Sequence, residues 1–203
     1  IASIDYRKAP EHPYPAAPED CYAGVCWVFE HAADLGMDTR NIGLMGASAG
    51  GGLALAVALM LRDRAGPALK YLLPIYPMID DRHETTSSHE VVDIGIWDRA
   101  GSIEAWGWYL GGAEADAYAA PARAEDLSGL PPTYIDVGDL DLFRDEDIAI
   151  TQRLSAAGVP VEFHLWTGAY HASELFAPNA RLSQRIWQTR YTAIRRLAGL
   201  PDH

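Results

Sequence analysis

Ser48 is the middle residue of the pentapeptide G-A-S-A-G at positions 46–50. The pentapeptide lies between a predicted strand, Asn41–Met45, and a predicted helix, Ala49–Arg64. A G-x-S-x-G pattern at a strand-to-helix turn is typical of a nucleophilic serine, because small neighbours permit a tight, strained turn that exposes the hydroxyl. We expect side chains at the two glycine positions to collide with neighbouring backbone. The pattern therefore predicts nucleophilic chemistry at Ser48.

The backbone N–H group of Ala49 lies at the start of the predicted helix, where it can face an oxyanion that develops beside the serine. The alternative interpretation is structural, with Ser48 capping the helix beside glycines that serve packing. A serine hydroxyl is a weak nucleophile at neutral pH. The catalytic interpretation therefore requires a histidine base and an acid that fixes the tautomer of that histidine.

His171 is the candidate base. It lies in a loop between the last predicted strand, Val161–Trp166, and the last predicted helix, Asn179–Ala198. On a hydrolase sheet the expected order along the chain is serine, acid, histidine, and His171 comes after both other candidates. His164 alternates within the strand instead, so we expect it to pack on a strand face with a hydrogen-bonded ring nitrogen.

The candidate acids follow the predicted strand Thr133–Val137 and are Asp139, Asp141, Asp145 and Asp147. Asp145 and Asp147 lie in the first turn of the next helix, where the helix dipole favours carboxylates for structural reasons. Asp139 and Asp141 lie in the loop, where either also suits a helix cap or a turn. The residue pattern alone leaves the choice between these two open.

Apolar segments alternate with helical ones along the chain. Strands are predicted at Ile1–Ile4, Asn41–Met45, Tyr71–Tyr76, Thr133–Val137 and Val161–Trp166. Helices are predicted at Pro18–Leu35, Ala49–Arg64, Ile103–Leu110, Arg144–Ala157 and Asn179–Ala198. This alternation predicts an α/β fold, a mostly parallel sheet flanked by helices, with its site at the carboxyl ends of the strands. The irregular segment Asp80–Asp98 is typical of a wall or lid.

Length and composition restrict the class of protein. The 203 residues fit one domain, 1–203, and the net charge of -12 disfavours a nucleic-acid partner. Cys21 and Cys26 lie on one predicted helix and are not spaced for a disulfide, and no signal peptide pattern opens the chain, so we expect a cytoplasmic protein.

Glycines interrupt the apolar stretch Ile42–Leu61, so no membrane span is expected. No residue cluster has metal-ligand spacing, and neither a metal nor a cofactor is expected.

Four segments carry a resemblance to a known family. They are D-Y-R-K-A-P-E-H-P-Y-P-A-A at 5–17, S-A-G-G-G at 48–52, Y-P-M at 76–78 and D-L-F-R-D-E at 141–146. Along essentially its whole length the chain resembles the hormone-sensitive-lipase-like family of α/β-hydrolases, and the bacterial carboxylesterases of that family in particular. The resemblance implies the α/β-hydrolase fold.

The resemblance also implies a role for each matched residue: Ser48 as nucleophile, Asp141 as acid, His171 as general base, and the Ala49 amide as one oxyanion donor. It favours Asp141 over Asp139. It further implies that Asp145 and Glu146 order loops and take no part in the reaction.

The chain departs from the family pattern in three ways. Ala47 stands where the family usually has an acidic residue, and Leu142 where it often has proline. The upstream His-Gly-Gly-type loop, which supplies further oxyanion donors, and the N-terminal cap are both absent from these residues. The chain therefore corresponds to roughly the C-terminal two-thirds of the usual fold, with a gap expected in the middle of the sheet. We hypothesise an N-terminally incomplete fold that is completed by another chain or by a rearranged strand order.

The resemblance implies hydrolysis of short-to-medium acyl esters through a Ser-His-Asp triad and an acyl-enzyme. The alternative is a non-catalytic ligand-binding protein on the same fold, or an inactive fragment. A small ester is the expected ligand, and a homo-oligomer or a completing chain is the expected assembly. Four aromatic residues suit either a substrate pocket or ordinary core packing: Trp97, Trp106, Trp108 and Phe143.

Overall fold

A four-stranded parallel sheet forms the centre of the computed structural model, which describes residues 1–200. Its strands are β1 (Gly43–Ala47), β2 (Tyr71–Ile75), β3 (Thr133–Gly138) and β4 (Val161–Trp166). They lie side by side in that order, and each neighbouring pair is parallel. The predicted α/β fold with a parallel sheet is therefore confirmed.

Helices connect the strands. The longer ones are α1 (Ala16–Glu30), α2 (Ala49–Asp63), α4 (Arg99–Leu110), α5 (Arg144–Ala156) and α7 (Arg181–Ala198). Shorter helical segments are α3 (Thr86–Glu90), α6 (Ser173–Phe176), Thr39–Asn41 and Pro121–Arg123. The long helices match the sequence prediction within two residues at each end, except that α1 ends at Glu30 and not at Leu35, and α4 begins at Arg99 and not at Ile103. The sequence does not predict α3 or α6, because segments this short show no helical period.

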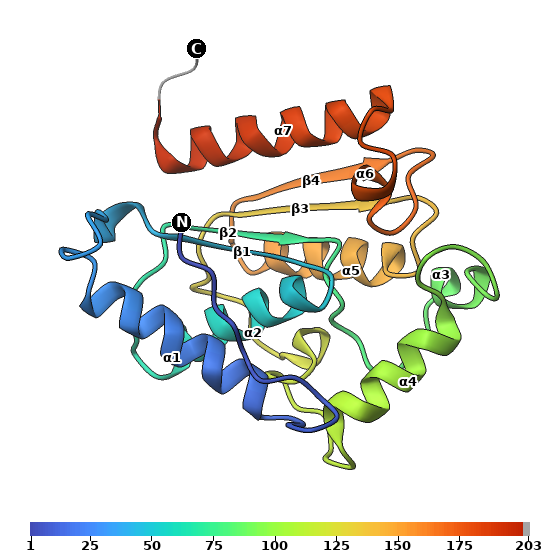
Figure 1. Ribbon diagram of the computed structural model, residues 1–203, viewed down its shortest axis with the longest axis horizontal. Coiled ribbons are helices and arrows are strands. Elements are labelled where there is room, and N and C mark those ends of the chain that lie inside the picture. Colours follow the sequence, from blue (N-terminus) through green and yellow to red (C-terminus); the bar gives the residue numbers. More distant parts are fainter. Residues whose placement is uncertain (201–203) are drawn as a thin grey trace.

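Helices cover both faces of the sheet (Figure 1). On one face, α2 and α5 pack on the strands through a cluster that includes Leu55, Leu59, Leu72, Ile135, Ile150 and Leu154. On the other face, α7 packs through a cluster that includes Leu73, Ile75, Tyr134, Val137 and Ala193. Helix α1 packs against α2 through Cys21 and Val25. The carboxyl ends of all the strands therefore open at one rim between these layers.

The prediction of a strand at Ile1–Ile4 is wrong. These residues form no strand, and β1 is an edge of the sheet, with no strand on its outer side among the described residues. A cavity of about 770 Å³ lies between Ile1–Ile4 and β1, and we call it the edge groove. The apolar, β-branched pattern of Ile1–Ile4 suits a strand, but a strand also needs a neighbour for its backbone hydrogen bonds, and none lies beside these residues. The gap expected in the sheet is thus an open edge.

Three further observations concern the described residues alone. Among residues 1–200, none of the helices is long and apolar enough to cross a membrane. In the same part of the chain, no group of three or more His, Cys, Asp or Glu side chains is arranged to hold a metal ion. Cys21 is buried and Cys26 half-buried, and both are free thiols.

Candidate active site

Ser48 sits on the sharp turn between β1 and α2. Its backbone angles, φ 56° and ψ -121°, are sparsely populated for a residue with a side chain, so the surrounding contacts must hold them. The Ser48 N–H donates to the Ile75 carbonyl at 2.9 Å, and the Met78 N–H donates to the Ser48 carbonyl at 3.0 Å. The Ser48 side chain makes no capping hydrogen bond to α2. The capping interpretation of this serine is therefore wrong.

The two motif glycines differ in what they require. A Cβ at Gly46 would lie 2.0 Å from the Gly50 carbonyl oxygen, so no side chain fits there. A Cβ at Gly50 would meet nothing within 4 Å, because Gly50 faces the edge groove. The expectation of a collision at both positions is thus correct for Gly46 and wrong for Gly50. The tight fit on the helix side comes from Gly52 instead, whose Cβ would lie 2.1 Å from the Met78 carbonyl oxygen.

His171 joins the serine to an acid. Its Nε2 lies 3.0 Å from the Ser48 Oγ, and its Nδ1 lies 2.8 Å from the Asp141 Oδ2. A carboxylate can only accept, so the Nδ1–H donates to Asp141 and the Nε2 lone pair faces the serine hydroxyl. The side chain of Asp141 is fully buried and that of His171 is 9% exposed. The three residues predicted to act together are brought into one hydrogen-bonded chain.

The structure separates the two loop aspartates that the residue pattern left open. Asp141 accepts from His171 and, through its Oδ1, from the Phe143 N–H at 3.0 Å. Asp139 instead accepts from the Gly168 N–H at 2.7 Å. Asp139 therefore ties the loop of residues 139–143, which we call the acid loop, to the loop that carries His171, while Asp141 contacts the imidazole itself.

Asp145 and Glu146 hold neighbouring loops, in agreement with the family resemblance. The Asp145 Oδ2 accepts from the Ser87 N–H at 2.8 Å, and the Ser87 hydroxyl donates to the Leu142 carbonyl at 2.9 Å. The Glu146 Oε1 accepts from the Ile79 N–H at 3.0 Å. Sequence reasoning gave Ser87 no role of its own and placed it only within the irregular segment Asp80–Asp98, predicted as a wall or lid. The contact shows that α3 is fastened to the acid loop.

Aromatic rings border the imidazole. Tyr76 lies edge-on to His171 with ring centroids 4.8 Å apart, and Phe143 does so at 5.2 Å. Sequence reasoning missed Tyr76 as a neighbour of the base, and the motif at 76–78 was its only signal. His164 lies on β4 with its Nε2 2.7 Å from the Glu162 Oε1, so its predicted structural role agrees with the geometry.

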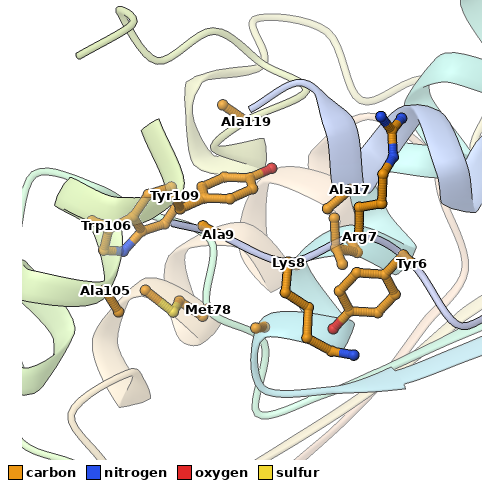
Figure 2. A pocket seen from close by; sticks show the side chains of 13 residues that line it. Tyr6, Arg7, Lys8, Ala9, Ala17, Met78, Ala105, Trp106, Tyr109 and Ala119 are labelled. Carbon is orange, nitrogen blue, oxygen red and sulfur yellow. The ribbon is translucent and has the colours of Figure 1, made fainter. Parts of the chain in front are cut away.

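A pocket of about 200 Å³ lies beside the serine turn (Figure 2). Ala49 and Gly52 of α2 line it, together with Met78 and with Trp106 and Tyr109 of α4. Residues 6–9 close the opposite side.

Of the four aromatic residues considered from the sequence, Trp106 alone lines this pocket. Trp108 is 50% exposed. Phe143 packs against His171, and Trp97 packs with the cluster around Leu142.

A family model for the alpha/beta hydrolase fold, Abhydrolase_3, matches residues 1–175. The chain belongs to this family. It is 42% identical over 167 residues to esterase LipI of Mycobacterium tuberculosis, a match that covers 81% of this chain and 52% of that protein. It is 40% identical over 168 residues to carboxylesterase NlhH of the same species, with 80% of this chain and 52% of that protein covered.

Solved structures agree with this membership. A bacterial heroin esterase matches with a TM-score of 0.93 at 42% identity, over 96% of this chain and 63% of that chain. Esterase LipW from Mycobacterium marinum matches with a TM-score of 0.94 at 37% identity, over 98% of this chain and 63% of that chain. The chain spans about half the length of the curated relatives that it matches. The resemblance to hormone-sensitive-lipase-like α/β-hydrolases is confirmed.

Two carboxyl groups lie buried beneath the acid loop of this α/β hydrolase. Burial raises the pKa of Asp147 well above its usual range, and the nearby carboxylates of Glu146, Asp141 and Asp136 raise it further. Burial likewise raises the pKa of Glu146. Neither carboxyl oxygen of Asp147 has a hydrogen-bond partner. Such a group is costly to ionise in the folded protein, because no cation or donor offsets its lost hydration.

We expect Asp147→Asn to become more stable relative to the wild type as pH rises. The folded-state pKa of Asp147 lies above the unfolded value of about 3.9, so between these two values the folded state binds more protons than the unfolded state. Wild-type stability therefore falls as pH rises through this window, whereas asparagine does not titrate. Urea unfolding over a pH series measures the difference.

Asp126→Asn is the matched control of opposite sign. Asp126 is exposed, and hydrogen bonds from the Ser128 backbone and hydroxyl lower its pKa. The carboxylate of Asp126 contributes to stability above the unfolded pKa, and this contribution is lost on acidification. The free energy of unfolding of Asp126→Asn should therefore decrease relative to that of the wild type as pH rises. A pH-independent difference between Asp147→Asn and wild type would contradict the prediction.

Proposed function

We propose that this chain hydrolyses carboxylic esters through Ser48, His171 and Asp141. The observation that carries the proposal is the continuous chain of hydrogen bonds, 3.0 Å from serine to imidazole and 2.8 Å from imidazole to carboxylate. The names of the similar proteins, esterase LipI, carboxylesterase NlhH and bacterial heroin esterase, support the same class of reaction.

The proposed reaction has two halves. His171 Nε2 takes the proton of Ser48 as the serine oxygen attacks the ester carbonyl, and Asp141 stabilises the resulting imidazolium. The imidazolium then protonates the departing alcohol, which leaves an acyl group on Ser48. Water attacks this acyl-enzyme with His171 again as base, and the carboxylic acid is released while the serine recovers its proton.

The Ala49 N–H is the proposed donor to the oxyanion. It belongs to the first residue of α2, whose N–H has no partner within the helix. The family resemblance assigns further donors to a His-Gly-Gly loop, a sequence that does not occur among the 203 residues. Loss of one such donor typically lowers turnover by about 10²- to 10³-fold, so we propose a contribution of this size for the Ala49 N–H.

The proposed substrates carry a short acyl or alcohol group. The pocket beside Ala49 has a volume of about 200 Å³, and large apolar side chains, Trp106 and Tyr109, bound it. Trp106 is 4% exposed, so it limits the depth of the pocket as a packed wall. A small apolar group fits such a space, whereas each further methylene group must displace side chains.

We also propose that the edge groove is filled by an extended segment of a second copy of this chain. The outer side of β1 presents unpaired backbone groups, and its Met45 is 47% exposed. Among the described residues that line the groove, Asp38 alone carries a charged side chain. An apolar groove along an open strand edge is a template for another strand.

A fluorophosphonate probe tests the nucleophile without a guess at the substrate. We expect wild-type protein to be labelled on Ser48 alone, and Ser48→Ala to be unlabelled. His171→Ala should label far more slowly, because the hydroxyl loses its base. Mass spectrometry of the labelled peptide identifies the residue.

Hydrolysis of p-nitrophenyl acetate provides the companion measurement. Loss of the serine should lower kcat by up to about 10⁶-fold, down to the background rate. Equal rates for wild type and Ser48→Ala, together with no labelling of the wild type, would reject the esterase proposal in favour of a non-catalytic binding protein.

Trp106→Ala should shift the preference toward longer acyl chains. We expect the ratio of kcat/KM for p-nitrophenyl octanoate to that for the acetate to rise by about 10-fold, because a deeper pocket admits further methylene groups. The matched control is Trp108→Ala, which removes an exposed tryptophan from the same helix. The ratio is independent of the amount of folded protein. An unchanged ratio in Trp106→Ala would contradict the role of this pocket.

Met45→Lys should disrupt the proposed assembly. We expect wild-type protein to sediment as an oligomer and the variant to shift toward monomer, because a charge is costly to bury in an apolar groove. Leu165→Lys is the matched control, since Leu165 is 43% exposed on β4, the opposite edge strand. An active wild-type monomer, or dissociation by Leu165→Lys alone, would contradict the proposal.

A further inference from the structure

A buried ion-pair network joins helix α7 to the loop that carries His171. Arg190 of α7 is 2% exposed. Its Nε and Nη2 donate to the two carboxylate oxygens of Asp136 on β3, at 2.7 and 2.8 Å. Its Nη1 donates to the Glu174 Oε1 at 2.6 Å. Glu174 lies in α6 and follows His171 by three residues.

Tyr76 links the same carboxylate to the imidazole. The Tyr76 hydroxyl donates to the Glu174 Oε1 at 2.8 Å, and its ring lies edge-on to His171. Burial and the neighbouring Glu174 carboxylate raise the pKa of Tyr76, so the hydroxyl keeps its proton and remains a donor. The Arg190 guanidinium lies over the Tyr76 ring, 5.3 Å from its centroid. Arg190, Glu174 and Tyr76 thus form one connected group that reaches the base through the Tyr76 ring, and we call them the clamp.

The loop around His171 needs external fastening. Helix α6 spans four residues and is therefore too short to hold its own position. Ala172, next to His171, has a φ of 56°, which an alanine adopts only when its surroundings impose it. Before His171, the loop is tied to the acid loop by Gly168 N–H to Asp139 and by Leu140 N–H to the Ala169 carbonyl. After His171, the clamp supplies the corresponding attachment.

We propose that Arg190, Glu174 and Tyr76 are positioning residues that hold the His171 ring in line with Ser48. This inference rests on the proposed ester hydrolysis. A buried arginine has few acceptable arrangements, because each unpaired N–H or carboxylate oxygen is costly in the interior. The clamp therefore has one arrangement, and that arrangement fixes the position at which α6 begins and the orientation of the His171 ring. A displacement of about 1 Å at the base is enough to lower turnover by about 10²-fold.

Tyr76→Phe and Tyr134→Phe form a matched pair of tests. Each removes one buried hydroxyl that donates to a carboxylate bound by Arg190, Glu174 for Tyr76 and Asp136 for Tyr134. Of these two tyrosines, Tyr76 is the one whose ring contacts His171, whereas the Tyr134 ring contacts His164. We expect Tyr76→Phe to lower kcat for p-nitrophenyl acetate by about 10-fold with KM unchanged, equivalent to one lost hydrogen bond of about 1.4 kcal/mol. Tyr134→Phe should leave kcat within about twofold of wild type, even where urea unfolding shows a similar loss of stability.

Glu174→Gln tests the ion pair itself. It keeps the shape of the side chain and removes its charge, and we expect kcat to fall by about 10²-fold with KM unchanged. The second readout is the proton NMR signal of the His171 Nδ1–H in its hydrogen bond to Asp141, which needs no substrate. We expect this signal to broaden or vanish in Glu174→Gln and Tyr76→Phe, and to persist in Tyr134→Phe. Arg190→Lys, which keeps the charge but not the forked donors, should retain part of the activity of the wild type.

The outcomes separate the clamp from the proposed function. Absence of fluorophosphonate labelling in the wild type overturns the esterase proposal, while the NMR signal still reports on the clamp. A normal kcat and a sharp Nδ1–H signal in both Tyr76→Phe and Glu174→Gln overturn the clamp. Equal losses of kcat in Tyr76→Phe and Tyr134→Phe also overturn it, because they show a general structural role. Should Glu174→Gln fail to fold, Tyr76→Phe alone decides between these results.

Discussion

The imidazole of His171 must bond to two groups that lie 30 and 123 residues away along the chain. This requirement is the constraint on which the other features of the site depend. A parallel sheet meets it, because the loops after β1, β3 and β4 all leave the carboxyl rim, where Ser48, Asp141 and His171 converge. The strained turn at Ser48 and the left-handed Ala172 are consequences, since one turns the chain at the serine and the other turns it directly after His171.

Carboxyl groups surround this meeting point, and the protein accommodates them in two ways. Asp136 and Glu174 share the guanidinium of Arg190, so each is buried with a cation and several donors. Asp147 has no such partner, and burial raises its pKa instead. The first arrangement has a defined geometry, whereas the second makes the stability of the protein depend on pH. The acidic composition of the chain is therefore a property of its interior as well as of its surface.

The open edge of β1 lies next to the site without being part of the triad. Ser48, Asp141 and His171 are assembled by loops whose strands already pair with one another. The edge groove instead borders Gly46 and Gly50, the two glycines that flank the serine turn. A segment seated there would lie beside Gly50, the residue that follows the proposed oxyanion donor Ala49. The open edge and the Ser48–His171–Asp141 hydrogen bonds thus belong to different parts of the molecule.

The sequence by itself determined the features that arise from neighbouring residues. The serine turn, the bounds of β4 and the parallel order of strands and helices follow from local spacing and apolar periodicity. Only the tertiary structure decided the features that need a distant partner. Ile1–Ile4 has the pattern of a strand but no neighbour to pair with, and Asp139 and Asp141 differ only in which loop each one meets. The hydrogen bonds of Arg190 and Tyr76 to Glu174, which follows His171 by three residues, were likewise decided by the tertiary structure. A hydrogen bond between residues far apart in the chain is set by the path of the whole backbone, and no local pattern records that path.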